Sequence, residues 1–400
     1  MQNHQEDIKE IRSNIIKGLT SQYLPAFIVG TSESLLNSTP GIKLLFSMFS
    51  VIAAIFFLYG YVVCADAIDE YAIYKGYKNY WFVYSILNVF GLSILFLFKN
   101  KNLARNNWND KEPLYRFSIA AIFYSYLAIP LLIIPIYYII AFIIMGFESV
   151  EYLQEDPDFD AFTNFISIPI AWYFFREMRN AKLDYRIIFG SFKKLNWKLP
   201  VGLGIIEYFF ARGINSITLY GVSFLFPEYI DSLINREYTT APISWILVAI
   251  SSLIYAPIME ELFFRGIIFQ KIAIKKSMSR GVLISAIAFA LIHFRYDLIP
   301  LSLFGVISAI LYFRTKQLAT PILYHFTYNL IVISRRIYFQ VFPNRDTTIN
   351  TVLEYQQHVR EHIGLYFLFI AVSVPYLIYF IYKNLPRNND IDKLPYFANQ

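Results

Sequence analysis

The stretch YAPIMEELFFRGIIF, residues 255–269, places two adjacent carboxylates and an arginine inside an apolar run that begins at residue 241. Such a run is typical of a helix that crosses a bilayer, because about 20 apolar residues span the hydrocarbon core. Charged side chains at that depth are energetically expensive, and they usually mark functional positions. The stretch therefore predicts a membrane protein with a chemical site inside its membrane-embedded part.

The rest of the 400-residue chain has the same character. It is 56% hydrophobic, 19% aromatic and only 16% charged, which exceeds the apolar content of ordinary soluble domains. Further apolar runs lie at 44–64, 81–98, 117–146, 161–175, 200–226, 281–294, 299–313, 321–334 and 364–382. They are continuous rather than alternating in polarity, which favours helices over a barrel. We predict an all-α polytopic membrane protein with about 8–10 transmembrane helices.

The net charge of +6 is explained by membrane topology rather than by nucleic-acid binding. Lys and Arg gather in alternate loops, whereas the loop at 148–160 carries six carboxylates and no basic residue. This distribution is the positive-inside pattern, so we expect both termini on the cytoplasmic side of the cell membrane. The single cysteine, Cys64, excludes an intrachain disulfide and a thiolate metal cluster.

The charged residues of the opening stretch have a defined helical geometry. Glu261 and Arg265 are four residues apart and share one face of a helix, so they can pair, whereas Glu260 points about 100° away. One carboxylate is then neutralised and the other is free. The alternative is an ion pair that only holds helices together.

Two histidines also lie in apolar runs. His293 follows Phe289 by four residues, and His325 precedes Asn329 by four, so each pair shares a helical face. Counted at about 1.5 Å per residue from the nearest basic loop, Glu260, His293 and His325 lie roughly 14–19 Å deep. We therefore expect the three side chains to meet in one plane. Taken alone, each histidine also suits interhelical hydrogen bonding.

This set of side chains is suited to hydrolysis. A carboxylate among apolar walls near a histidine can act as general base on a water molecule. A second histidine and an asparagine supply donors for a tetrahedral oxyanion. A zinc site built from two histidines and a carboxylate is the competing hypothesis, but no HExxH motif places such ligands on one helix. We therefore expect no metal or other cofactor, with zinc as the alternative.

Three ordered motifs resemble those of the CAAX protease and bacteriocin-processing (CPBP) family, which includes type II CAAX prenyl endopeptidases and Abi-type immunity proteins. They are Glu260-Glu261-x-x-x-Arg265, Phe289-x-x-x-His293 and His325-x-x-x-Asn329. The resemblance covers about residues 241–335 and implies an intramembrane endopeptidase. It further implies that Glu260 and His293 activate water and that His325 and Asn329 form the oxyanion hole. Glu261 and Arg265, with Phe289, would brace the site.

These considerations divide the chain into four parts. We expect a polar cytoplasmic segment at 1–42, N-terminal transmembrane helices of unassigned role at 43–240, the CPBP-type catalytic helices at 241–335, and a loop, last helix and cytoplasmic tail at 336–400. The catalytic core thus falls in the C-terminal half. Glu207 and Arg212 are also intramembrane charges, and a structural pair is the simpler expectation for them, with a place at the site as the alternative.

The expected substrate is a peptide or membrane protein in or on the lipid bilayer, with or without a lipid group, and not a nucleic acid. The resemblance allows bacteriocin self-immunity or peptide maturation as the biological setting. A membrane immunity or transport protein without catalysis is the main rival, because transporters also place Glu, Arg and His in their spans. Paired halves with matching interrupted helices would favour a transporter, and none is found in the sequence.

Overall fold

The computed structural model contains helices as its only regular elements in the part of the chain that it describes. The described residues are 2–33, 40–77, 80–98, 113–117, scattered positions between 119 and 143, 166–191, 195–234, 242–293, 296–341 and 349–399. The all-α prediction is confirmed. The predicted span 117–146 lies largely outside these residues, and the acidic loop 148–160 lies wholly outside them.

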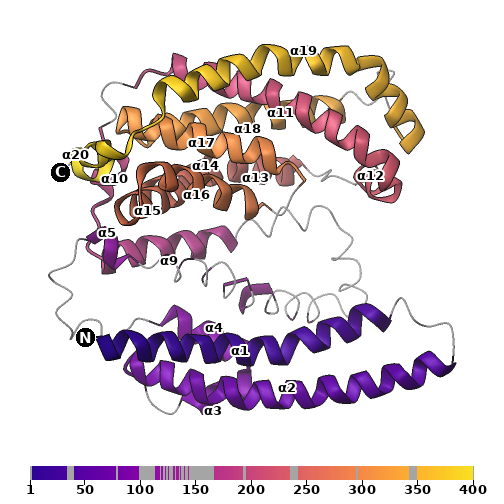
Figure 1. The fold of residues 1–400 in the computed structure, drawn as a ribbon, viewed down its shortest axis with the longest axis vertical. Helices are drawn as coiled ribbons and strands as arrows, with labels where there is room; N and C mark the ends of the chain where they lie inside the picture. Colours follow the sequence, from indigo (N-terminus) through magenta and orange to yellow (C-terminus); the bar gives the residue numbers. More distant parts are fainter. Residues whose placement is uncertain are drawn as a thin grey trace. The chain divides into compact units, whose positions relative to one another are not determined.

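The helices form two compact units. The first contains α1 (Gln2–Glu33), α2 (Pro40–Tyr74), α3 (Tyr80–Leu87) and α4 (Val89–Leu97), with α1 lying along α2 (Figure 1). Its core includes Cys64, Ile68 and Tyr84. The segment expected as a polar tail at 1–42 thus contains a 32-residue helix, one of whose side chains, Gln22, is buried against Tyr84.

The second unit holds the motif residues. Its elements are α5 (Pro113–Arg116), α9 (Ser167–Asn180), α10 (Tyr185–Phe189), α11 (Lys198–Leu225), α12 (Pro227–Ile234), α13 (Pro242–Ile250), η3 (Ser251–Tyr255), α14 (Ala256–Glu261), η4 (Leu262–Phe269), α15 (Gln270–Lys275), α16 (Met278–Leu291), α17 (Leu298–Thr315), α18 (Ala319–Val341), α19 (Val352–Asn384), η5 (Asn388–Lys393) and α20 (Pro395–Ala398). α11 packs against α18 and α19, and α16 packs against α17 (Figure 1).

Three described helices are long and apolar enough to cross a membrane by length and composition. They are Ser244–Lys275, Leu298–Thr315 and Val352–Asn384. Each contains or matches an apolar run of the sequence, and the chain is therefore a membrane protein with several apolar helices. The total of about 8–10 spans and the cytoplasmic termini stay predictions.

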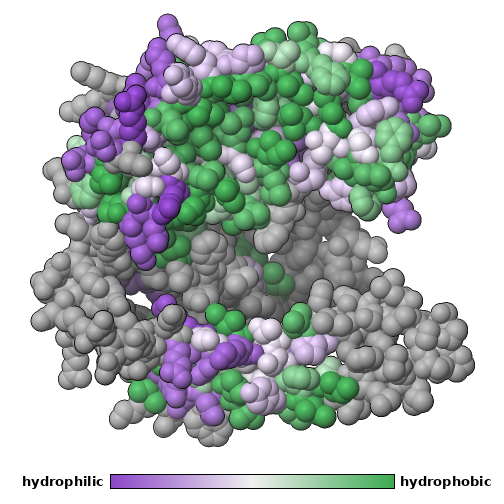
Figure 2. Space-filling model, in the orientation of Figure 1, coloured by the Kyte–Doolittle hydropathy of each residue, from purple (hydrophilic) through white to green (hydrophobic). Residues whose placement is uncertain are grey.

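The surface of the second unit agrees with a lipid environment. Figure 2 shows hydrophobic side chains over the middle of its helices and hydrophilic ones toward the helix ends. Large apolar side chains are among the most exposed, including Leu225, Val372 and Tyr382 at 73%, 67% and 86%. A contiguous apolar face of this kind would be a liability in water, whereas lipid tails cover it at no cost.

The C-terminal segment is bound to the second unit by polar contacts. The backbone N–H of Tyr396 donates to the buried side-chain oxygen of Gln270 (2.7 Å), and the Asn399 amide donates to the carbonyls of Ile187 and Lys316. Gln270 belongs to the helix of the opening stretch, where it also donates to Gly266 O at 2.6 Å. Its bond with Tyr396 therefore links the C-terminal segment to that helix.

α16 and α17 approach each other through small residues. A Cβ atom built on Gly305 would lie 2.7 Å from Cα of Ala286, closer than two carbon atoms can pack. Small residues at such contacts let helix backbones come together, which is the usual source of packing energy between membrane helices. This contact fixes the two helices between which Phe289 and Phe304 stack (5.6 Å).

A Gly305→Ala substitution is therefore expected to destabilise the second unit by about 1–3 kcal/mol, because the added methyl group forces α16 and α17 apart. Thermal unfolding in detergent measures the effect. Gly202→Ala is the matched control, since a Cβ there meets nothing within 4 Å and the gain in helix propensity is the same. Equal melting temperatures for the two variants would contradict the close contact.

Candidate active site

The two glutamates of the opening stretch lie in a helix that departs from α geometry. Glu260 and Glu261 end the short segment α14, which has π-helical segments on both sides, η3 and η4. Pro257 occupies the first turn of α14, where it supplies no backbone N–H to the helical ladder. π-Segments interrupt α-helices most often at functional sites. The two glutamates therefore lie in a short α-helical segment between two π-helical ones.

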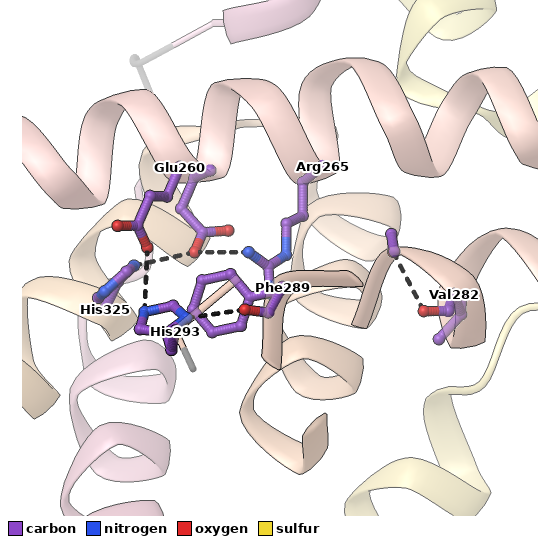
Figure 3. A network of polar contacts seen from close by, with 8 residues as sticks. Glu260, Arg265, Val282, Phe289, His293 and His325 are labelled. Carbon is purple, nitrogen blue, oxygen red and sulfur yellow. Dashed lines mark hydrogen bonds and ion pairs between the residues drawn. The ribbon is translucent and has the colours of Figure 1, made fainter. Parts of the chain in front are cut away.

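Glu261 is at the centre of a buried cluster of charges. Its Oε1 lies 3.1 Å from Nη1 of Arg265 and 3.0 Å from Nδ1 of His325, so the pairing that the spacing predicts is present. The Glu261 and Arg265 side chains are 0% exposed. Figure 3 shows Arg265 and His325 on opposite sides of the polar network. Glu261 is thus neutralised by Arg265 and hydrogen-bonded to His325.

Arg265 is additionally supported by an aromatic ring. Its guanidinium carbon lies 4.5 Å from the ring centroid of Phe289, in the range of a cation–π contact. Nε and Nη2 of Arg265 are buried without a hydrogen-bond partner among the described residues. The aromatic face therefore compensates part of the desolvation of the guanidinium, and this gives Phe289 of the second motif a physical role.

Glu260 differs from its neighbour in exposure and in partner. Its Oε2 lies 3.9 Å from Nε2 of His293, and both side chains are 22% exposed. Nδ1 of His293 is 2.7 Å from the carbonyl oxygen of Phe289, and because a carbonyl can only accept, Nδ1 carries the proton. In the neutral imidazole Nε2 is then a base that faces the carboxylate of Glu260 (Figure 3).

Asn329 lies one helical turn beyond His325 on α18. Its Nδ2 donates to the carbonyl oxygen of Ser252 at 2.7 Å. Ser252 belongs to η3, where the π geometry alters the usual backbone hydrogen bonding. Asn329 therefore connects α18 to the helix of the two glutamates, and its amide group retains a second hydrogen for another acceptor.

Sequence reasoning missed two aromatic residues at the site. Phe304 of α17 lies 4.9 Å from the His325 ring and 4.4 Å from the Tyr324 ring, which walls the imidazole on one side. Neither residue belongs to a motif, and nothing in the pattern of apolar residues distinguishes them from the rest of the core.

The pairing of Glu207 with Arg212, the simpler expectation from the sequence, is wrong. Arg212 donates to the hydroxyl of Tyr366 (3.4 Å) and lies over its ring. Both carboxyl oxygens of Glu207 are buried without a hydrogen-bond partner among the described residues. The two side chains are five residues apart, a spacing that does not bring them to one helical face.

The side chains do not fit a resident zinc ion as they stand. No group of three or more His, Cys, Asp or Glu side chains is placed to hold a metal within the described ranges. His325 uses Nδ1 on Glu261, and Glu261 is already paired with Arg265. Zinc requires three such ligands around one point, whereas the site divides its carboxylates between two separate histidines.

Comparison with known proteins finds similarity for the part of the chain that contains the three motifs. Residues 242–331 match the family described as type II CAAX prenyl endopeptidase Rce1-like. This segment therefore resembles that family. It is also similar to the Bacillus subtilis (strain 168) protein named "Putative membrane peptidase YdiL", with 39% identity over 90 residues. The aligned part is 22% of this chain and 36% of that protein, so the chain spans about a third of its relative. No solved structure matches the chain significantly.

The Rce1-like segment contains all four predicted catalytic residues and the three supporting ones. The resemblance seen in the three motifs is thereby confirmed. The contacts bring Glu260 to His293 and Glu261 to His325, so the site consists of two carboxylate–histidine pairs on adjacent residues of one helix. The roles of these residues in catalysis stay predictions.

An Arg265→Met substitution is expected to cost about 3–5 kcal/mol of stability, because it leaves the buried Glu261 carboxylate without its cation. Adding Glu261→Gln should recover part of that loss. Thermal unfolding of both variants in detergent measures the effect. The control is Lys393→Met, which breaks an exposed pair with Asp390 that is worth less than about 1 kcal/mol. A melting temperature for Arg265→Met equal to that of the control would show that the buried pair is not formed.

Proposed function

We propose that this protein is an intramembrane endopeptidase that hydrolyses a peptide bond with a water molecule activated by Glu260. The observation that supports it most is the difference between the adjacent glutamates: Glu261 is fully buried and neutralised, whereas Glu260 is partly exposed beside an imidazole base. A general base must be reachable by water and unpaired. The Glu260 side chain is 22% exposed and its Oε2, although buried, makes no hydrogen bond among the described residues, whereas Glu261 is fully buried and paired.

The 3.9 Å between Glu260 Oε2 and His293 Nε2 is too long for a direct hydrogen bond. It suits two acceptors that hold one water molecule, each taking one of its protons. The water oxygen then presents a lone pair to the carbonyl carbon of the substrate. As the C–O bond forms, the proton moves to Glu260, and it is later delivered to the leaving amine as the C–N bond breaks.

His325 and Asn329 would stabilise the oxyanion that this attack produces. His325 can donate to the oxyanion through Nε2 only as an imidazolium, because a neutral ring that donates Nδ1–H to Glu261 carries no hydrogen on Nε2. Asn329 contributes the amide hydrogen that Ser252 does not use. Loss of one such donor typically lowers the rate about 100-fold to 1000-fold. Glu261, Arg265 and Phe289 hold His325 in place.

The proposed substrate class is supported by the location of the site among apolar helices and by the family that residues 242–331 match. A peptide or membrane-protein substrate, with or without a lipid group, would reach carboxylates that lie among apolar helices. Bacteriocin self-immunity and peptide maturation are the settings we propose. The zinc-dependent form of the same peptidase is the second candidate, and a binding or transport protein without catalysis is the third.

The decisive experiment is cleavage of a peptide library by the purified full chain in liposomes, with and without a chelator. We expect cleavage that resists chelation. Glu260→Gln and His293→Ala should each lower it by about 100-fold to 10,000-fold, because each removes a proton acceptor for the water. Glu228→Gln, at an exposed position of α12, is the matched control and should cleave like the wild type.

The other outcomes separate the candidates. Loss of cleavage with chelator and its return with zinc would establish the zinc-dependent enzyme. Equal cleavage by wild type and Glu260→Gln would remove the glutamate mechanism. A phenotype in cells that survives Glu260→Gln, together with no cleavage of any peptide by the wild type, would favour a protein that only binds or transports its ligand.

A further inference from the structure

Another buried carboxyl group lies close to the site and belongs to none of the motifs. Glu207 of α11 is 0% exposed, and both of its oxygens are buried without a hydrogen bond to any described residue. The nearest arginine in the sequence, Arg212, binds Tyr366 instead. A buried polar group without a partner is rare in folded proteins and calls for an explanation.

The hydroxyl of Tyr324 on α18 is in the same situation. Tyr324 is fully buried and its hydroxyl has no hydrogen bond to a described residue. Tyr324 lies within electrostatic range of Glu207, Glu261 and Arg265. α11 and α18 are in close contact here, because a Cβ built on Gly204 would lie 3.0 Å from the Tyr324 carbonyl oxygen.

Tyr324 is connected to the catalytic imidazole by two aromatic contacts. Its ring stacks on Phe304 with centroids 4.4 Å apart and planes at 18°. Phe304 in turn meets the His325 ring edge-on at 4.9 Å. Displacement of the tyrosine ring would therefore move the wall against which His325 rests.

The charge state of Glu207 follows from its surroundings. On α18 the titratable side chain of Tyr324 lies within electrostatic range of Glu207, and the cation of its own helix, Arg212, is engaged with Tyr366 of α19. Phe304 of α17, which stacks on Tyr324, does not titrate. An isolated carboxylate in a dry interior is far less stable than the neutral acid, and the neutral acid can also donate a hydrogen bond.

We propose that Glu207 is a positioning residue, a protonated acid that shares a hydrogen bond with the Tyr324 hydroxyl, directly or through one buried water, and thereby fixes His325. The proposal rests on the proposed peptidase function for its effect on catalysis, but the protonated acid does not depend on it. One bond satisfies both unpaired groups, and it ties α11 to the wall of the site.

The protonated acid is tested without any activity. The infrared spectrum of the wild type should contain a carboxylic-acid carbonyl band that is absent from Glu207→Gln. Melting should agree: unfolded Glu207 loses its proton above about pH 4.3, so rising pH favours the unfolded wild type and its melting temperature should fall relative to Glu207→Gln. The unfolding constant changes by at most about tenfold per pH unit. Glu228→Gln, at an exposed glutamate, should show neither effect.

The positioning role is tested by a double-mutant cycle on kcat. Glu207→Leu and Tyr324→Phe should each lower kcat about tenfold with little change in KM, since a displaced oxyanion donor weakens transition-state binding only. The double variant should be no slower than either single one, because both remove the same bond. Glu207→Gln, which keeps a donor, should recover most of the rate lost in Glu207→Leu.

Each result has a definite meaning. An infrared band and a melting profile that do not change in Glu207→Gln would show an ionised carboxylate and overturn the proposal. Additive effects on kcat, or effects on KM alone, would overturn the link to His325 while leaving the protonated acid in place. If no peptide is cleaved by the wild type although the band is lost in Glu207→Gln, it is the peptidase function, and with it the positioning role, that fails.

Discussion

The structure of the second unit depends on one electrostatic constraint: a charge removed from water must be paired. Arg265 is 0% exposed and is held by Glu261 at 3.1 Å and by the face of Phe289 at 4.5 Å. These contacts offset part of the desolvation of the two ions, although Nε and Nη2 of Arg265 have no hydrogen-bond partner among the described residues. The ion pair thus fixes the relative positions of η4, α16 and α18, whose side chains complete it. All three sequence motifs contribute a side chain to this cluster.

The same constraint accounts for the different surroundings of the two adjacent glutamates. Glu261 is committed to Arg265 and His325 and holds the surrounding helices together. Glu260 makes no ion pair with a lysine or arginine among the described residues, which leaves it available for the proposed role beside His293. The two neighbouring glutamates thus differ in burial and in partners, the factors that govern the chemistry of a carboxyl group. Adjacent residues of a helix point about 100° apart, so the two side chains of α14 reach different neighbours.

Much of this arrangement could be predicted from the sequence. Continuous apolar runs gave the all-helical class, and four-residue spacings identified Glu261 with Arg265 and placed the histidines on helical faces. Spacing alone could not predict which histidine contacts which glutamate. That pairing depends on helix packing and on π-helical segments, for which the composition gives no signal. The pairing of Glu207 with Arg212 failed because proximity in sequence was taken for proximity in space. Phe304 and Tyr324 have no sequence signal, since aromatic residues are common throughout the chain.

One feature of the central helix bears on how such a sequence can diverge. Every residue from Glu261 to Gln270 is buried, so this stretch has no side that faces lipid or water. Most membrane helices can accumulate apolar replacements on their outer face without harm. A helix surrounded on all sides has no such face, and each replacement must be accommodated by neighbours that are themselves packed. Replacements are therefore expected to be tolerated better on the peripheral helices than in this stretch, which lies inside the segment that matches the family model, residues 242–331.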